Sequence, residues 1–173
     1  MTSQEKVYIG IDNGATGTIG LIAGCNYRMY ETPVEKKLSY TKKKQFISQL
    51  KTFEFQDIIY SFLSETGHNE NECIVILERP LVNPQLFSAS INAVRLFQAQ
   101  LTILDMMEIP YMYIDSKEWQ RTMLPSGIKG TTELKLASMD VGRRLFPSCK
   151  DLISMHKDAD GILIAEHARR KGL

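Results

Sequence analysis

Uninterrupted apolar segments at four places along the chain predict buried strands. Each segment is short and rich in Ile, Val or Tyr, which is the pattern of a strand covered on both faces. The four segments lie at residues 7–12, 18–23, 73–78 and 111–114. Asn13–Gly17 joins the first two segments and contains two glycines, so it predicts a hairpin turn. A further strand is expected near Tyr27–Thr32, ended by Pro33.

Between these strands, apolar residues recur at spacings of three and four, which is typical of amphipathic helices. The longest such segments run from about Thr41 to Glu65, ended by Gly67, and from Phe87 to Met107; the first is either continuous or broken near Phe55. Shorter helices are expected at 116–123, at 131–145 with Thr131 or Thr132 as its cap, and at about 158–170. This order predicts an α/β fold with a mixed central sheet flanked by helices, in a single domain covering residues 1–173.

The composition narrows the class of protein. Of 173 residues, 43% are apolar and 24% are charged, which is the make-up of an ordinary globular domain. The net charge of +1 excludes a histone-like polycation, so nucleic-acid binding would need local clusters of basic residues. No apolar segment approaches the ~20 residues that span a bilayer, and three scattered cysteines favour free thiols. We therefore expect a soluble, cytoplasmic protein without a membrane partner.

Two carboxylates stand at the carboxyl ends of predicted strands. Asp12 follows the first apolar segment and Glu78 ends the third. Open α/β sheets place their ligand sites at this edge, and a buried ionised carboxylate needs a hydrogen-bond donor, an ion pair or a metal ion. A purely structural alternative remains, in which Asp12 caps the turn after it and Glu78 pairs with Arg79 or another basic residue.

The segment His156–Asp160 supplies a third group of candidate ligands, just before an apolar helix. Either Asp158 or Asp160 could simply cap that helix, although one cap does not explain both residues. His156 and Asp160 would share a face if the helix began early enough. Asp160 is the firmest candidate, with Asp158 and His156 competing for the supporting position.

Oxygen ligands from two strands and one helix suit Mg²⁺ or Mn²⁺ rather than zinc. Two such ions ~4 Å apart activate a water and stabilise the leaving oxygen of a displacement at phosphorus. This pattern therefore favours a phosphodiester nuclease that holds two ions in its active site.

Three motifs resemble the acidic motifs of RuvC-type Holliday junction resolvases. They are Ile9–Gly14, Val75–Glu78 and Ala159–Ala165, in the same order and spacing over nearly the whole chain. Leu96–Ala99 and Asp115–Arg121 are similar to further segments of the family. Several positions are similar to compact phage-type members, which fits a phage- or virus-encoded protein acting in a host cell; they are Lys117–Trp119, Lys135, Phe146–Pro147, Ala165–Glu166 and Arg169–Arg170.

The resemblance implies a ribonuclease-H-like fold, a homodimer and Mg²⁺-dependent, symmetrical nicking of four-way DNA junctions, with no small-molecule cofactor. It implies that Asp12, Glu78 and Asp160 are metal ligands. The family's fourth carboxylate usually lies three residues before the last one, where this chain has Lys157. Asp158 or His156 would then replace it.

A second departure from the family concerns the aromatic residue with which some members wedge the junction open. Leu81 stands near that position, and Phe87 is a candidate substitute.

Basic residues gather in two parts of the chain and favour phosphate contact, although a solvated helix face would also explain a run of lysines. No acidic residue interrupts the stretch 36–51. Lys135 is the candidate for stabilising charge on the attacked phosphate. The candidate DNA-binding residues are Lys36, Lys37, Lys42, Lys43, Lys44, Lys117, Arg121 and Lys129.

Three other functions remain open. Asp12–Thr18 is also similar to the phosphate loop of actin-like and sugar-kinase ATPases, but those enzymes need two lobes and the chain is long enough for one. A ribonuclease-H-like RNA-processing nuclease or exonuclease would use the same carboxylates. A catalytically silent DNA-binding module would not need them. The helix from Phe87 to Met107 is the candidate dimer surface, with a buried core helix as the alternative.

Overall fold

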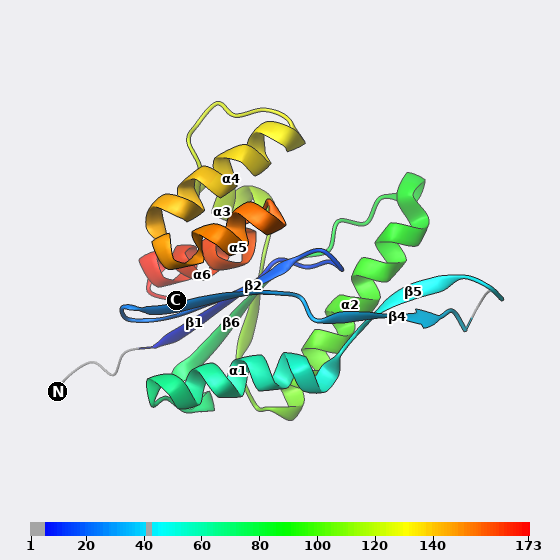
Figure 1. Cartoon of the computed structure of the whole chain (residues 1–173), viewed down its shortest axis with the longest axis horizontal. Coiled ribbons are helices and arrows are strands. Elements are labelled where there is room, and N and C mark those ends of the chain that lie inside the picture. Colours follow the sequence, from blue (N-terminus) through cyan, green and yellow to red (C-terminus); the bar gives the residue numbers. More distant parts are fainter. Residues whose placement is uncertain (1–5, 41–42) are drawn as a thin grey trace.

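The computed structural model describes residues 6–40 and 43–173 and contains a mixed central sheet (Figure 1). The order of its strands is β3-β2-β1-β6-β7. Strands β1, β2 and β3 pair antiparallel, whereas β1, β6 and β7 pair parallel. The bounds are Val7–Ile11 for β1, Thr18–Ala23 for β2, Asn26–Glu31 for β3, Cys73–Glu78 for β6 and Tyr111–Ile114 for β7. The predicted strands and the mixed sheet are confirmed.

Helices cover both faces of this sheet (Figure 1). Helices α1 and α2 lie on one face, and α3 to α6 lie on the other. Their bounds are Thr52–Thr66 for α1, Phe87–Met106 for α2, Ser116–Met123 for α3, Thr131–Leu145 for α4, Lys150–His156 for α5 and Asp160–Lys171 for α6. Within the described residues, none of the helices is both long and apolar enough to cross a membrane.

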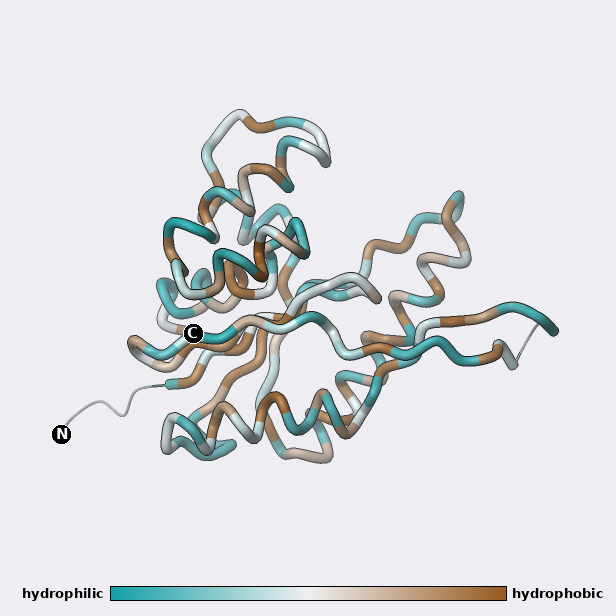
Figure 2. Tube along the Cα trace, viewed as in Figure 1, coloured by the Kyte–Doolittle hydropathy of each residue, from teal (hydrophilic) through white to brown (hydrophobic). Residues whose placement is uncertain are grey.

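Successive side chains of each strand point to opposite faces of the sheet, because the period of a β-strand is two residues. They therefore pack into two separate cores. On β1, Val7, Ile9 and Ile11 point toward α1 and α2, while Tyr8 points toward α3 to α6. Figure 2 shows hydrophobic residues concentrated in the central strands. The sheet is therefore covered on both faces, which explains why its strands read as continuous apolar runs.

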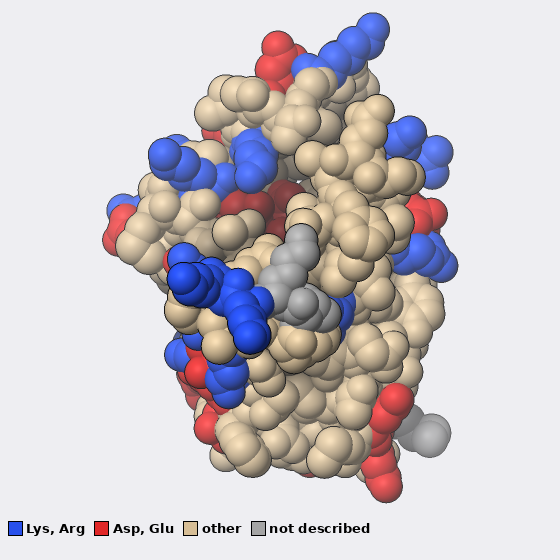
Figure 3. Space-filling model, turned by 90° about the vertical axis from the view of Figure 1, so that its right-hand side faces the viewer, with Lys and Arg blue, Asp and Glu red and all other residues tan. Residues whose placement is uncertain are grey.

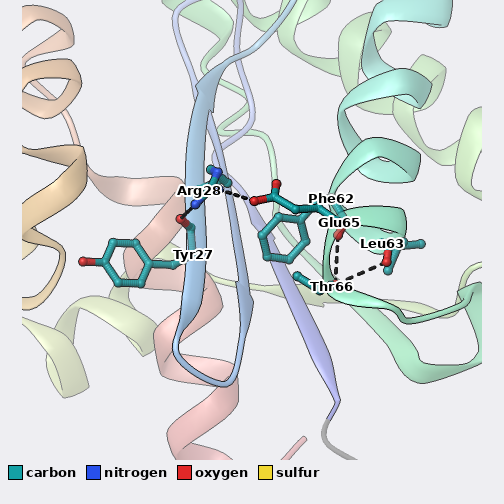
Figure 4. Close-up of polar contacts among 6 residues, drawn as sticks. All are labelled: Tyr27, Arg28, Phe62, Leu63, Glu65 and Thr66. Atoms are coloured by element: carbon teal, nitrogen blue, oxygen red, sulfur yellow. Dashed lines mark hydrogen bonds and ion pairs between the residues drawn. The ribbon is translucent and has the colours of Figure 1, made fainter.

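An ion pair links the outer strand of the sheet to the first helix (Figure 4). The Arg28 guanidinium on β3 donates to the carboxylate of Glu65 on α1 and also to the carbonyl of Tyr27. Near the end of α1, the Thr66 hydroxyl donates to the carbonyl of Phe62 over 2.8 Å. Gly67 ends the helix, as predicted, and it has the left-handed conformation with φ = 71°.

The prediction of one helix from Thr41 to Glu65 is wrong in its first part. Strands β4 (Val34–Leu38) and β5 (Phe46–Leu50) form a separate two-stranded sheet, and α1 begins only at Thr52. The apolar residues of β5 continue the helical spacing of α1. The spacing alone therefore predicted one long helix where the structure has a strand followed by a helix. In the structure Leu50 is buried but Phe46 is exposed.

Two further expectations about the second half of the chain need correction. An additional helix, α5, precedes the last one, and Lys157 ends it in the left-handed conformation with φ = 61°. The last helix therefore begins at Asp160 rather than near Asp158. Neither Thr131 nor Thr132 caps α4, because its N-cap residue is Gly130.

Helix α6 lies directly on β1 and β2, at a distance that only glycine permits. Gly10 and Gly20 face each other across the two strands. A Cβ atom on Gly10 would lie 2.2 Å from the Gly161 carbonyl oxygen, and one on Gly20 would lie 2.1 Å from the Cα atom of Ile162. These contacts place the beginning of α6 beside the ends of β1 and β2.

We expect Gly20→Ala to lower the free energy of unfolding by about 1–3 kcal/mol, because the added methyl group must push α6 away from the sheet. Urea denaturation followed by circular dichroism measures this change. Ser64→Ala, on an exposed position of α1, is the control and should change the free energy by less than about 0.5 kcal/mol. A Gly20→Ala protein as stable as the wild type would contradict the close packing.

Candidate metal centre

The parallel pairing of β1 and β6 brings the first two candidate carboxylates to one edge of the sheet. Ile11 pairs with Leu77, so Asp12 and Glu78 follow at the same level of adjacent strands. The Asp12 backbone N–H donates to the Thr18 carbonyl over 3.0 Å, which closes the loop between β1 and β2. The strands therefore fix both backbones from which these side chains project.

The start of α6 brings two more carboxylates to the same edge. Single carboxylate oxygens of Asp12, Asp158 and Asp160 all lie within 4.8 Å of one another. Asp158 is buried, and the other two are half-buried. Residues separated by almost the whole chain therefore form one acidic cluster.

Hydrogen bonds hold the two aspartates of this cluster that belong to the α6 region. Asp158 Oδ1 accepts the backbone N–H of Asp160 over 2.7 Å, and it lies 3.4 Å from the Thr18 hydroxyl oxygen. The Ser138 hydroxyl, on α4, donates to Asp160. Thr18 Oγ1 also accepts the backbone N–H of Gly161 over 3.0 Å. Asp158 thus has a local structural function just before α6, although the N-cap residue of that helix is Ala159 and neither aspartate caps it as the alternative expected.

Glu78 is held by a different element of the structure. The indole N–H of Trp119 on α3 donates to Glu78 Oε2 over 2.7 Å. The alternative in which Glu78 pairs with Arg79 does not hold, since the Arg79 guanidinium pairs with Asp115 over 3.0 Å.

Burial and mutual repulsion disfavour the charged forms of these carboxylates. Burial raises the pKa of Asp12 well above its usual value of 3.8, and the charges of Asp158 and Asp160 raise it further. Burial, with the charge of Asp158, raises the pKa of Asp160 to about 7. Burial also raises the pKa of Glu78, and the hydrogen bond from Trp119 opposes that rise. The charge of Lys135 lowers the pKa of both Asp12 and Asp160, which places its ammonium near the cluster.

His156, the competing ligand, lies in α5 and not on the face of α6. Its Nδ1 contacts the Glu31 carboxylate at 2.9 Å, and its Nε2 contacts the Thr16 carbonyl at 2.8 Å. Both ring nitrogens therefore already have partners. The structure brings Asp158, and not His156, into the acidic cluster.

The candidate DNA-binding residues lie in two groups. Lys117 and Arg121 on α3 line a cavity of about 400 Å³, and exposed Lys129 belongs to the loop before α4. Lys36 and Lys37 lie on β4, where Lys37 pairs with Glu35 over 2.8 Å. Lys43 and Lys44 are exposed in the connection to β5, and Lys42 is outside the described residues.

Figure 3 views the molecule from the side toward which the β4–β5 hairpin projects in Figure 1. Acidic side chains appear at the bottom of a hollow, and Lys and Arg side chains gather on the projections around it. A polyanion approaching this face would meet basic side chains before the recessed carboxylates.

Comparison of the whole structure with solved structures identifies the fold. The chain matches a Thermus thermophilus RuvC in complex with a Holliday junction substrate, with a TM-score of 0.54 and 13% identity over 96% of each chain. It matches a second T. thermophilus RuvC structure with a TM-score of 0.50 and 15% identity, again over 96% of each chain. The chain has a RuvC-like fold. It is the ribonuclease-H-like fold expected from the acidic motifs.

Sequence comparison alone does not reach this result: no protein-family model matches the chain, and no curated protein matches it. At 13–15% identity, the likeness to RuvC establishes the fold and leaves the activity to be argued from the site.

The residues of this RuvC-like fold fit a divalent cation. Three carboxylates share a small volume, and the charge of Lys135 acts on two of them. Oxygen donors of this kind suit Mg²⁺ and Mn²⁺. A divalent ion would offset the repulsion that raises the pKa values of the cluster.

Three supporting hydrogen-bond donors were not predicted as site residues: Thr18, Trp119 and Ser138. Trp119 belongs to a segment that resembles the family, but nothing in that segment indicates that its indole reaches Glu78. Ser138 lies three residues after Lys135, and this spacing puts the two on one face of α4. That spacing was the one signal from which Ser138 could have been found.

We expect the metal-free protein to lose stability as the pH rises from about 4 to about 7. Over this range the folded cluster retains protons that the unfolded chain has released, because folding raises the pKa values of Asp12 and Asp160. Thermal unfolding in a chelator at several pH values measures this loss. Mg²⁺ should raise the melting temperature most at neutral pH, where the cluster is charged.

Asp12→Asn is the informative variant for this measurement, because it removes one repelling charge. In chelator, the melting temperature of Asp12→Asn should depend less on pH than that of the wild type. Mg²⁺ should also raise it by a smaller amount. If the melting temperatures of the wild type and of Asp12→Asn depended on pH in the same way, the acidic cluster would not be the cause of that dependence.

Proposed function

We propose that the protein is a metal-dependent, structure-selective endodeoxyribonuclease that resolves four-way DNA junctions by paired symmetrical nicking. The observation that carries this proposal is the group of three carboxylates within 4.8 Å on a RuvC-like fold. One matched RuvC structure is a complex with a Holliday junction substrate, which supports branched DNA as the substrate class here.

In this proposal Asp12, Asp158, Asp160 and Glu78 hold Mg²⁺, and Mn²⁺ can substitute. When bound, two such ions would activate a water and stabilise the leaving oxygen at phosphorus. Asp158 takes the supporting position that the sequence left open, because both nitrogens of His156 are already engaged. Trp119 and Ser138 keep Glu78 and Asp160 in place.

Lys135 is proposed to act on the phosphate. It is exposed on α4 and lies close enough to the cluster to lower the pKa of Asp12 and Asp160. An ammonium at this position would stabilise the negative charge that develops on the attacked phosphate.

Basic side chains around the hollow are proposed to hold the rest of the DNA. Lys43 and Lys44 belong to the β4–β5 connection, Lys117 and Arg121 line a cavity at α3, and Lys129 is exposed in the loop before α4. Lys36 belongs to the same hairpin, whereas the Glu35 partner of Lys37 offsets part of its charge. Lys42 is proposed with them on sequence grounds.

We further propose a homodimer formed through the first half of α2, since one active site for each opposed strand explains paired nicking. This half of the helix extends away from the sheet (Figure 1) and leaves large apolar side chains exposed. Those proposed for the interface are Leu86, Ile91 and Val94.

Phe87 and Leu81 are candidates for contact with the junction centre. Both side chains are exposed, at 68% for Phe87 and 83% for Leu81. An exposed aromatic ring can stack on an unpaired base, which makes Phe87 the stronger candidate.

The central test is cleavage of end-labelled DNA by variants of the acidic cluster. Asp12→Asn and Glu78→Gln keep the side-chain size but lose the charge that holds Mg²⁺, so cleavage should fall by orders of magnitude. Asp158→Asn and Asp160→Asn should behave in the same way. Junction affinity measured in Ca²⁺ should survive, and the variants should remain folded.

His156→Ala is the matched control, because it lies beside the cluster and has other partners; it should lose far less activity. The substrates are a four-way junction, a matched duplex and an RNA–DNA hybrid. Wild-type rates in folded Asp12→Asn would refute a nuclease at this site. Preference for the hybrid would instead support the RNA-processing alternative.

The Lys43→Ala/Lys44→Ala variant tests the basic hairpin. Each lost phosphate contact should reduce the slope of log affinity against log salt by about one unit, so the slope should fall by about two. Fluorescence anisotropy with a labelled junction at several salt concentrations measures it. Lys171→Ala, at the opposite end of α6 from Asp160, should leave the slope unchanged. An unaltered slope in the double variant would assign these lysines to a solvent-exposed surface.

A further inference from the structure

The only tryptophan of the chain contacts Glu78, at the edge of the sheet where Asp12 also lies. Trp119 lies on α3, its side chain is fully buried, and its indole N–H donates to Glu78 Oε2 over 2.7 Å. Among the described residues, no second hydrogen bond to the Glu78 carboxylate is found. One oxygen of Glu78 is therefore fixed, and the other remains available as an acceptor.

The surroundings of Trp119 make this hydrogen bond rigid. The ring packs in the core between the sheet and helices α3 to α6, with Ile76, Ile162 and Ala165 in the same cluster. A side chain packed at interior density cannot turn away without opening a cavity. The indole is also a donor only, so it favours one orientation of the carboxylate.

A second connection fixes the position of α3 relative to β6. The Arg79 guanidinium, next to Glu78, pairs with Asp115 at the start of α3 over 3.0 Å. The Arg79 backbone N–H donates to the Ile114 carbonyl over 2.9 Å. The end of β6 and the start of α3 are thus joined by two contacts of Arg79, the residue after Glu78.

We propose that Trp119 is a positioning residue that holds Glu78 in the orientation needed to bind a divalent cation together with Asp12 and Asp160. This inference rests on the proposed metal-dependent function and deepens it. Trp119 acts on the ion through Glu78. Residues that hydrogen-bond to a metal ligand without touching the ion act in the same way, and their loss typically reduces metal affinity or activity about 10- to 100-fold.

A purely structural alternative assigns Trp119 to the core and treats Glu78 merely as the acceptor that satisfies its buried N–H. The two interpretations differ in what happens when the N–H is removed but an aromatic ring is kept. Trp119→Phe makes this change. If Glu78 only satisfies the indole, stability falls and the affinity for the ion does not.

The experiment measures Mn²⁺ affinity of the full chain without DNA, by electron paramagnetic resonance of free Mn²⁺. In Trp119→Phe the dissociation constant should rise about 10- to 100-fold. Junction cleavage should then need correspondingly more Mg²⁺, and saturating Mg²⁺ should restore most of the maximal rate. Phe146→Leu is the control, because Phe146 is buried in the same core cluster and contacts Tyr27 rather than the carboxylates.

The proposal would be overturned if folded Trp119→Phe bound Mn²⁺ with an affinity within about threefold of the wild type. A change of that size is well below the one expected when a partner of a metal ligand is lost. An equal loss in Phe146→Leu would also overturn it, because a general loss of packing would then suffice. A wild type that binds no Mn²⁺ would overturn the metal site itself. Mn²⁺ binding that depends on Trp119 in a protein that cleaves no junction would refute the proposed function alone.

The wild-type protein offers a second measurement that does not require Trp119→Phe to fold. Since Trp119 is the only tryptophan, tryptophan fluorescence reports on the surroundings of this one ring, which include the bond to Glu78. Mg²⁺ should change this fluorescence with the same midpoint as binding, and Glu78→Gln should abolish the change. Unchanged fluorescence at saturating Mg²⁺ in the wild type would overturn the proposal.

Discussion

Contact between the backbone of α6 and strands β1 and β2 determines where the acidic cluster lies. Asp158 and Asp160 stand at the start of that helix, so their distance from Asp12 is set by how closely the helix approaches the sheet. Gly10 and Gly20 provide that closeness, and a Cβ atom on either would overlap the helix backbone. A larger residue at either position would move α6 away from the sheet, and this movement would also separate the carboxylates. The same close contact therefore requires glycine and sets the geometry of the site.

This constraint forces together charges that repel one another. Burial raises the pKa of Asp12, Glu78 and Asp160, and hydrogen bonds from Trp119 and Ser138 offset only part of that effect. Folding thus concentrates negative charge where it is costly, and a divalent cation is the natural compensation. The donors on α3 and α4 can orient these oxygens, because neither donor brings a full charge that would compete with the ion.

The parts of this arrangement that were predictable from sequence depend on local periodicity. Continuous apolar runs identified β1, β2, β6 and β7, and the position of Asp12 and Glu78 at strand ends predicted a common edge. Contacts between residues far apart in the sequence could not be predicted from these local patterns. Nothing near His156 indicates that Glu31 and Thr16 occupy its ring nitrogens, and nothing near Trp119 indicates its contact with Glu78. The β4–β5 hairpin was missed because its apolar residues continue the spacing of α1.

That hairpin has a further physical consequence. A two-stranded sheet is marginally stable on its own, so β4 and β5 depend on other elements for their order. Part of that support comes from α2, where the Arg95 guanidinium lies 4.9 Å from the centre of the Tyr40 ring. Tyr40 and Arg95 also line a cavity of about 320 Å³ that lies between the hairpin and α2. The hairpin is therefore ordered partly by its contact with α2, so a partner that displaced the projecting half of α2 would also be expected to shift the exposed lysines of the hairpin.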